Sequence, residues 1–292
     1  MELSELIEKG WSEHEKSTVE IAEELEQNLE LIGAEDSDGA ASFMNLVNHT
    51  IGDHVGDRAR ALRVCEAANG RLTDLGNRES VLQLAVARHL AGDEKGAREA
   101  EDQLGEAATS QVRVRLLVSQ GLAHAGQWDA ALELYAPCIE VAESLPKGHT
   151  AEKAVALVSN NIASVLVRMD ERNEAQSALM ERAAHAAQKF WLRVGDWTNS
   201  ERADYLLATV YNALGRGPEA REYARRGLKT IATNGEARVD QAFLELALAK
   251  ACKLAGEREE QSLAILRATA LADEFGDEGL FNWFNNELKK AR

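Results

Sequence analysis

A recurring helix-breaking corner constrains this chain more than any other feature of its sequence. In the stretch LLATVYNALGRGPEAREYARRGL, which begins at Leu206, one amphipathic run ends at Gly215 and another starts at once. Glycine readily ends a helix in the left-handed conformation, and Pro218 suits the first turn of the helix that follows. The acidic Glu219 suits the positive amino end of the same helix. The stretch therefore predicts two helices joined by a tight turn.

Five similar corners occur elsewhere in the chain. Their sequences are HVGDRARA (54–61), LAGDEKGA (90–97), HAGQWDAA (124–131), RMDERNEA (168–175) and LAGEREEQ (254–261). Spacings of 36, 34, 44, 45 and 41 positions separate the six turn residues, which are Gly56, Gly92, Gly126, Asp170, Gly215 and Gly256. Repeats of this length are typical of stacked helical hairpins. Because the chain has only three prolines and lacks the alternating Val/Ile/Thr runs of strands, we predict an all-α fold.

The residues around the corners resemble the tetratricopeptide repeat (TPR) family, whose unit is a pair of antiparallel helices. TPR repeats have a small residue five positions after the turn. This position holds Ala61, Ala97, Ala131, Ala175 and Ala220 here, and Gln261 departs from the pattern. The small residue within the first helix is matched by Ala85, Ser119, Ala163, Ala208 and Ala249, with His49 as a departure. Small side chains let helix axes approach to about 8–10 Å. The resemblance implies a right-handed superhelix of stacked antiparallel helical hairpins, a TPR-like α-solenoid, over residues 42–270.

Both ends of the array are expected to carry capping helices, because a terminal repeat needs one polar outer face. Residues 2–32 read as a single amphipathic helix with a connector at 33–42, so residues 1–41 form an amino-terminal helix and linker. Residues 271–292 are expected to form the carboxyl-terminal cap. Its inward-facing residues would be Leu280, Phe281, Trp283 and Phe284. The alternative for either end is an interaction helix that forms a homodimer.

The charge balance and the cysteines limit the class of protein. With 33 basic and 49 acidic residues, the net charge of −16 disfavours nucleic acids and anionic membranes as partners. No run of about 18 apolar residues would span a bilayer, and the acidic amino terminus is unlike a signal peptide, so a cytoplasmic protein is expected. Cys65, Cys138 and Cys252 lie far apart, and we expect each to fill helix–helix packing.

Motifs of catalysis are missing from the sequence, and one histidine cluster is its nearest approach to a reactive site. No GxGxxG, GKS/GKT or GxSxG motif occurs, so we predict a non-enzymatic protein without a cofactor. In NHTIGDHVGD, His49 and Asp53 are four positions apart, and His54 and Asp57 are three apart. His14 on the amino-terminal helix would be a further ligand. Since no clear third and fourth ligands follow, we predict polar contacts between helices and no metal; a metal site, and an enzyme built on it, are the alternatives.

In the TPR family the first helix of each unit lines a concave groove, and the matching columns of this chain hold thirty residues. Five of them are basic and two acidic, whereas the composition of the whole chain predicts about three and five. We therefore predict a groove that binds an acidic or carboxylate-bearing peptide segment or protein terminus, with Tyr205 and Phe243 as aromatic anchors. The candidate residues are Arg113, Gln120, His124, Asn160, Ser164, Arg168, Arg202, Tyr205, Thr209, Asn212, Lys250 and Lys253. The alternative is that these cations only pair with acids across the helix stack.

These features together predict a protein–protein interaction scaffold or adaptor. The alternative function is a peptide- or ligand-sensing regulator, in which residues 1–41 would be the output module. The two functions differ in what peptide binding would do to the rest of the chain. A sensor should change its compactness when the peptide binds, and a scaffold should not.

Overall fold

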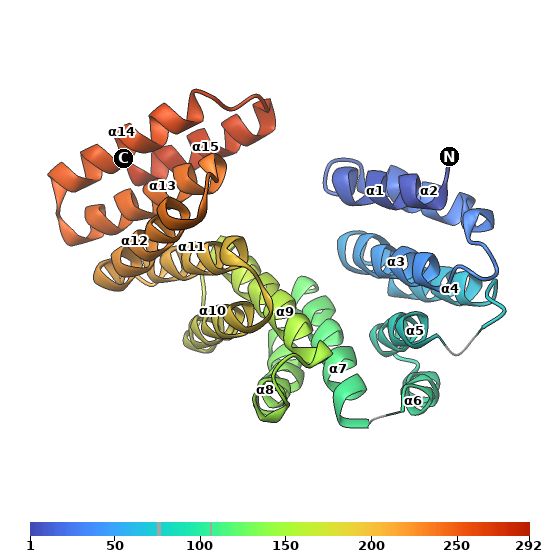
Figure 1. Cartoon of the computed structure of the whole chain (residues 1–292). Coiled ribbons are helices and arrows are strands. Elements are labelled where there is room, and N and C mark those ends of the chain that lie inside the picture. Colours follow the sequence, from blue (N-terminus) through green and yellow to red (C-terminus); the bar gives the residue numbers. More distant parts are fainter. Residues whose placement is uncertain (75–76, 106) are drawn as a thin grey trace. The chain divides into compact units, whose positions relative to one another are not determined.

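The computed structural model describes residues 1–74, 77–105 and 107–292, and this part of the chain is all-α, as predicted (Figure 1). None of its helices combines the length and the apolarity that a membrane-spanning helix requires. The chain divides into two compact units, unit 1 (Met1–Leu145) and unit 2 (Pro146–Arg292).

Unit 1 is built from short helices that pair with their neighbours in sequence. Its elements are α1 (Leu3–Glu13), α2 (Thr18–Gln27), the 3₁₀ helix η1 (Leu29–Leu31), α3 (Ser37–Val47), the π-helix η2 (Asn48–His54), α4 (Arg58–Asn69), α5 (Arg78–Ala91), α6 (Glu94–Gln103), α7 (Ala107–His124) and α8 (Trp128–Ser144). The pairs α3/α4, α5/α6 and α7/α8 pack as hairpins, and α5 also contacts both α3 and α7. The first helices of successive hairpins therefore lie side by side.

Unit 2 repeats this arrangement with longer helices. Its elements are α9 (Thr150–Arg168), α10 (Glu174–Val194), α11 (Trp197–Ala213), α12 (Gly217–Asn234), α13 (Arg238–Ala255), α14 (Arg258–Ala272) and α15 (Glu278–Ala291). The hairpins are α9/α10, α11/α12 and α13/α14, while α11 contacts α9 and α13, and α13 contacts α15. The helices α9, α11, α13 and α15 thus form one row. Helical repeats are confirmed within each unit, and the right-handed superhelix stays a prediction.

The glycine corners have the backbone conformation that the sequence predicts. The φ angles lie between +71° and +81° at Gly56, Gly92, Gly126, Gly215 and Gly256. The predicted corner at Asp170 is different, because no described residue other than glycine has a positive φ. There α10 begins only at Glu174, which a capping box between Asn173 and Gln176 stabilises, so that Ala175 is exposed instead of packed. The remaining matched small residues are all buried.

We expect Gly256→Ala to lower the free energy of unfolding by about 1 kcal/mol, because a β-carbon disfavours the left-handed conformation by about 1–2 kcal/mol. Gly276→Ala is the matched control. A β-carbon at either position would meet no atom within 4 Å, but only Gly256 has a positive φ, of +74°. Urea unfolding of both variants measures the difference, and equal stability of the two would contradict the role assigned to the corner.

The predicted single helix over residues 2–32 is wrong, because the chain folds it into α1, α2 and η1. Leu6 and Leu25 would lie about 28 Å apart along a straight helix, yet both are fully buried in one core cluster with α3 and α4. Gly10 permits this close packing, since a β-carbon there would lie 2.4 Å from Cδ2 of Leu46. The break between α1 and α2 therefore lets both apolar stripes reach the same core.

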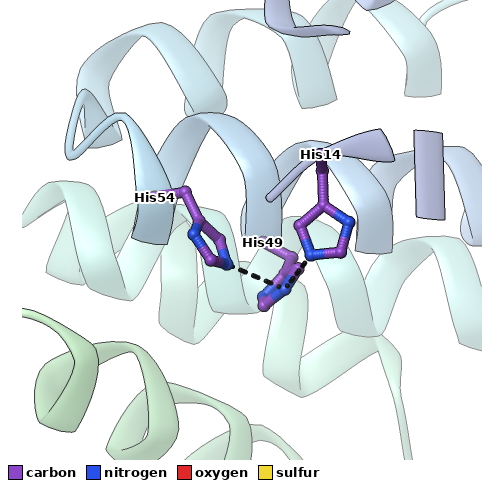
Figure 2. A group of neighbouring side chains, drawn as sticks. All are labelled: His14, His49 and His54. Carbon is purple, nitrogen blue, oxygen red and sulfur yellow. Dashed lines mark hydrogen bonds between the residues drawn. The ribbon is translucent and has the colours of Figure 1, made fainter. Parts of the chain in front are cut away.

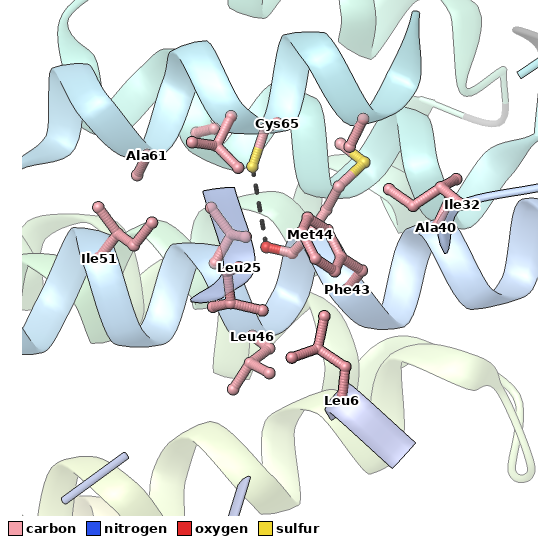
Figure 3. Close-up of a cluster of buried hydrophobic side chains, with 14 of the residues drawn as sticks. Leu6, Leu25, Ile32, Ala40, Phe43, Met44, Leu46, Ile51, Ala61 and Cys65 are labelled. Atoms are coloured by element: carbon pink, nitrogen blue, oxygen red, sulfur yellow. Dashed lines mark hydrogen bonds between the residues drawn. The ribbon is translucent and has the colours of Figure 1, made fainter. Parts of the chain in front are cut away.

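The core of unit 1 continues into the segment that the sequence predicts as a connector (33–42). Asp36 caps α3 by accepting a hydrogen bond from the Gly39 amide, so the helix starts before residue 42. Phe43 and Met44 are fully buried in the core cluster that also holds Leu6 and Leu25 (Figure 3). Beside them lies Cys65, whose thiol donates to the Met44 carbonyl. All three cysteines are buried and free, which confirms that they fill helix packing.

Helix α15 caps the end of unit 2, but only part of its aromatic face is buried. Phe284, Leu288 and Ala291 form the buried stripe, at positions i, i+4 and i+7. Phe281 and Trp283 lie off this stripe and are 39% and 51% exposed. The prediction that both dock inward is therefore wrong.

Candidate functional site

In unit 1, the predicted groove cation Arg113 is already paired. Arg113 on α7 donates two hydrogen bonds, of 2.7 and 2.6 Å, to the carboxylate of Glu79 on α5. The guanidinium of Arg113 lowers the pKa of Glu79, although burial acts to raise it. Gln120 and His124 lie on the same helix, half-buried. This pair joins the first helices of two successive hairpins.

The cations predicted for unit 2 are paired in the same way. Arg202 on α11 donates to Asp240 on α13 at 2.9 Å, and Lys250 on α13 donates to Glu287 on α15. Burial acts to raise the pKa of Glu287, but the ammonium groups of Lys250 and its neighbour Lys290 lower it overall. The pairing of cations across the helix stack, which the sequence left open as the alternative, is therefore present at these positions.

Several of the other predicted groove residues of unit 2 already use their polar groups in hydrogen bonds within the unit. The amide nitrogen of Asn212 donates to the Ala247 carbonyl at 2.9 Å, and the hydroxyl of Thr209 donates to the carbonyl of Tyr205 at 2.8 Å. These bonds tie helices together or stay within one helix. Three further positions are Asn160, which donates to Asn161 at 3.4 Å, half-buried Ser164, and Lys253, which donates to the Lys290 carbonyl at 3.1 Å. Arg168 is exposed at the end of α9.

Three aromatic rings meet where α11, α13 and α15 lie side by side. The rings of Phe243 and Trp283 lie 4.2 Å apart between centroids, and Tyr205 meets the edge of Phe243 at 6.4 Å. Phe243 is buried, and burial raises the pKa of Tyr205 to about 12. Trp283, which is 51% exposed, packs on Phe243 from the solvent side. We call the surface formed by Arg202, Tyr205, Lys250 and Trp283 the leading face of unit 2.

Sequence reasoning missed a set of buried acids on the first helices of unit 2. Asp204 on α11 accepts hydrogen bonds from Arg226 and Gln188, and Glu245 on α13 accepts two from Arg267. The acid and the arginine are 22 positions apart in both pairs, which is a signal that the sequence contains. Their burial follows from the position of each acid on the apolar stripe of its helix.

Cys252, Glu257 and Glu260 form one group of potential metal ligands. Both of its carboxylates are paired with arginines, and its thiol is protonated. Glu257 is paired with Arg221, and Glu260 accepts a hydrogen bond of 2.5 Å from Arg225. Burial raises the pKa of the Cys252 thiol to about 11, which keeps it protonated at neutral pH. This group has its charges balanced by arginines.

A second group, the histidine cluster, consists of His14, His49 and His54 in unit 1 (Figure 2). His14 follows the end of α1, whereas His49 and His54 come from the π-helix η2. The Nε2 atom of His49 lies 3.1 Å from Nε2 of His14 and 3.1 Å from Nε2 of His54. The sequence predicts two histidine–aspartate pairs. In the first, Nδ1 of His49 lies 3.6 Å from Oδ2 of Asp53. The second is not formed among the described contacts, because Asp57 caps α4.

Comparisons with known proteins add little to this description. No family model and no curated protein matches the sequence. Among solved structures, the chain is similar to the crystal structure of BtubC (BKLC) from P. vanneervenii, with 18% sequence identity and a TM-score of 0.49. The match covers 80% of this chain and 94% of that one.

Proposed function

We propose that this chain is a non-enzymatic, TPR-like interaction scaffold that binds a peptide segment or protein terminus on the leading face of unit 2. The observation that carries the proposal is Trp283, a large aromatic side chain that is 51% exposed yet held against buried Phe243. Aromatic side chains that are rigid before binding lose little entropy on contact, which makes them typical anchors of interfaces.

The charges around Trp283 favour an extended ligand with a carboxylate. Arg202 is 61% exposed and is oriented by its pair with Asp240, which leaves part of its donor set directed to solvent. Lys253 is exposed on α13, the next helix of the row. A carboxylate of the ligand would share Arg202 with Asp240, while an apolar side chain of the ligand would pack on Trp283.

The packing of the amino terminus favours a scaffold over the alternative of a sensing regulator. Leu6 on α1 and Leu25 on α2 are fully buried in the core that they share with α3 and α4. An output module that must be released on binding would have to break this core. Residues 1–41 are better described as the first layer of unit 1.

We expect Trp283→Ala to weaken peptide binding by more than about tenfold, as is usual for a central aromatic anchor. Peptides would be selected against the full chain from a library of acidic sequences with free carboxyl termini, and their dissociation constants measured by fluorescence anisotropy. Phe281→Ala is the matched control, because Phe281 is an exposed aromatic residue on the same helix. Reversing Arg202 to Glu should weaken binding as well. A library without binders, or binders that tolerate Trp283→Ala, would reject the leading face as the site.

A further inference from the structure

The three imidazoles of the histidine cluster present the same ring nitrogen to one another. Figure 2 shows the rings of His14 and His54 directed at His49, which lies between them. Imidazole nitrogens are either donors or acceptors, depending on which one carries the proton. The partners of the opposite ring nitrogens decide this for two of the three residues.

We assign the proton of neutral His14 to its Nδ1 atom. It lies 3.2 Å from the Gly10 carbonyl oxygen and 3.1 Å from the Trp11 carbonyl oxygen, and carbonyl oxygens only accept hydrogen bonds. In the neutral imidazole, Nε2 of His14 therefore carries a lone pair. We assign the same tautomer to His49, because its Nδ1 lies 3.6 Å from Oδ2 of Asp53, and a carboxylate attracts an N–H and repels a lone pair. A histidine whose Nδ1–H points at a carbonyl or carboxylate is the usual arrangement of a metal ligand.

Two lone pairs thus face each other at 3.1 Å, which is repulsive unless a cation lies between them. A proton can bridge only one pair of nitrogens at a time, but His49 has a close neighbour on each side. Zinc–nitrogen bonds of about 2.0–2.1 Å in tetrahedral geometry separate the ligand nitrogens by about 3.3 Å. The two separations from His49 are close to this value, and the three ligand nitrogens all lie within 4.8 Å of one another, so one small divalent ion can bridge them.

The charge and the backbone around the cluster point the same way. The side chain of Asp53 is only 8% exposed, and its Oδ1 is buried without a hydrogen-bond partner in the described part of the chain. A divalent cation on His49 would balance this buried negative charge. The π-helix brings His49 and His54, five positions apart, onto one side, and π-helical turns frequently occur at functional sites.

We propose that His14, His49 and His54 form a binding site for a divalent transition metal of the Zn²⁺ class, with Asp53 orienting His49. Three neutral imidazoles suit Zn²⁺, Co²⁺ and Ni²⁺ and are poor ligands for Mg²⁺ or Ca²⁺. His54 is exposed, so the fourth coordination position is open to water. The ring of His124 borders this side, 6.0 Å from the ring of His54. The site lies in unit 1, and the proposal does not rest on peptide binding to unit 2.

The test is direct metal binding by the full chain after its metal has been removed with a chelator. We expect calorimetry with Zn²⁺ at neutral pH to give one ion per chain, and Co²⁺ to give the visible absorption of a tetrahedral complex. Changing a ligand, as in His54→Gln, should weaken Zn²⁺ binding by more than about 100-fold, since even outer partners contribute about 10–100-fold. Asp53→Asn, which keeps all three ligands, should weaken it by about 10–100-fold.

His89→Gln is the matched control, because His89 is also a half-buried histidine of unit 1 with a carboxylate partner, Glu101 at 2.8 Å. This variant should bind Zn²⁺ like the wild type. Circular dichroism reports whether each variant is folded, and the Co²⁺ spectrum of the wild type tests the site without any substitution. The proposal is overturned if the wild type binds no stoichiometric Zn²⁺, or if His54→Gln and His89→Gln bind it equally well.

Discussion

Replacing Arg226 by methionine is expected to lower the free energy of unfolding by about 2–3 kcal/mol. Removing one member of a buried ion pair leaves the other charge without compensation, which typically costs about 3–5 kcal/mol. We expect a smaller value because the arginine is 44% exposed, whereas Asp204 is only 6% exposed. Without the guanidinium, Gln188 is the donor that stays on the Asp204 carboxylate, at 2.7 Å. Chemical denaturation followed by circular dichroism measures the loss.

The neighbouring residue provides the control for this prediction. Arg225 on the same helix pairs with Glu260, but this pair lies at the surface, so Arg225→Met should cost less than about 1 kcal/mol. A second change tests the mechanism. If the buried charge causes the loss, then adding Asp204→Asn to Arg226→Met should restore most of the stability. A double variant as unstable as the single one would show that Arg226 acts through packing on the Tyr223 ring instead.

The fold was largely predictable because its corners are local. Five of the six predicted corners end their first helix with a left-handed glycine, and this local requirement appears in the sequence as a single residue type. The break at residues 14–17 has no such signal, since it is caused by the need of α1 and α2 to reach one core. The corner at Asp170 also lacks a left-handed glycine. There the connection between the helices is longer, and the side chain of Asn173 caps α10.

The candidate sites were predictable only in part, because pairing depends on neighbouring helices. Arg202 and Lys250 occupy positions that line the groove in the TPR family. Their partners, Asp240 and Glu287, do not occupy such positions, so the pairing was not predicted. For the histidine cluster, α-helical spacing predicts contacts three or four positions apart. The π-helix instead aligns residues five positions apart, and its stability comes from packing that no local pattern encodes. The exposure of Trp283 was not predicted, because it depends on how α15 is rotated about its axis against α13.

Glu201→Gln is expected to stabilise the protein, and the gain should grow as the pH rises. The Glu201 side chain on α11 is completely buried, and neither of its oxygens has a hydrogen-bond partner in the described part of the chain. Burial first, and the nearby Asp240 carboxylate second, raise the pKa of Glu201 to about 8, although Arg202 opposes this. The folded protein therefore holds a proton that the unfolded chain has already released at neutral pH.

The pH dependence has a definite sign and window. Below the ordinary pKa of 4.5, Glu201 is protonated in both states, and the substitution should change stability little. Between that pH and about 8, the unfolded chain ionises while the folded protein does not, so the wild type loses stability as pH rises. Glutamine has nearly the same shape and no charge. The advantage of the variant should therefore grow to the order of 3 kcal/mol near pH 8.

Urea unfolding of both proteins near pH 5 and near pH 8 measures this difference, and taking the difference cancels the titration of every carboxylate that the two proteins share. Glu222→Gln, an exposed substitution on α12, should change the free energy of unfolding by less than about 0.5 kcal/mol. If the advantage of Glu201→Gln were the same at both pH values, Glu201 would have to be ionised in the folded protein. Its charge would then require compensation by Arg202, whose Nε lies 3.7 Å from Oε1, and Arg202 would be less available to a ligand on the leading face.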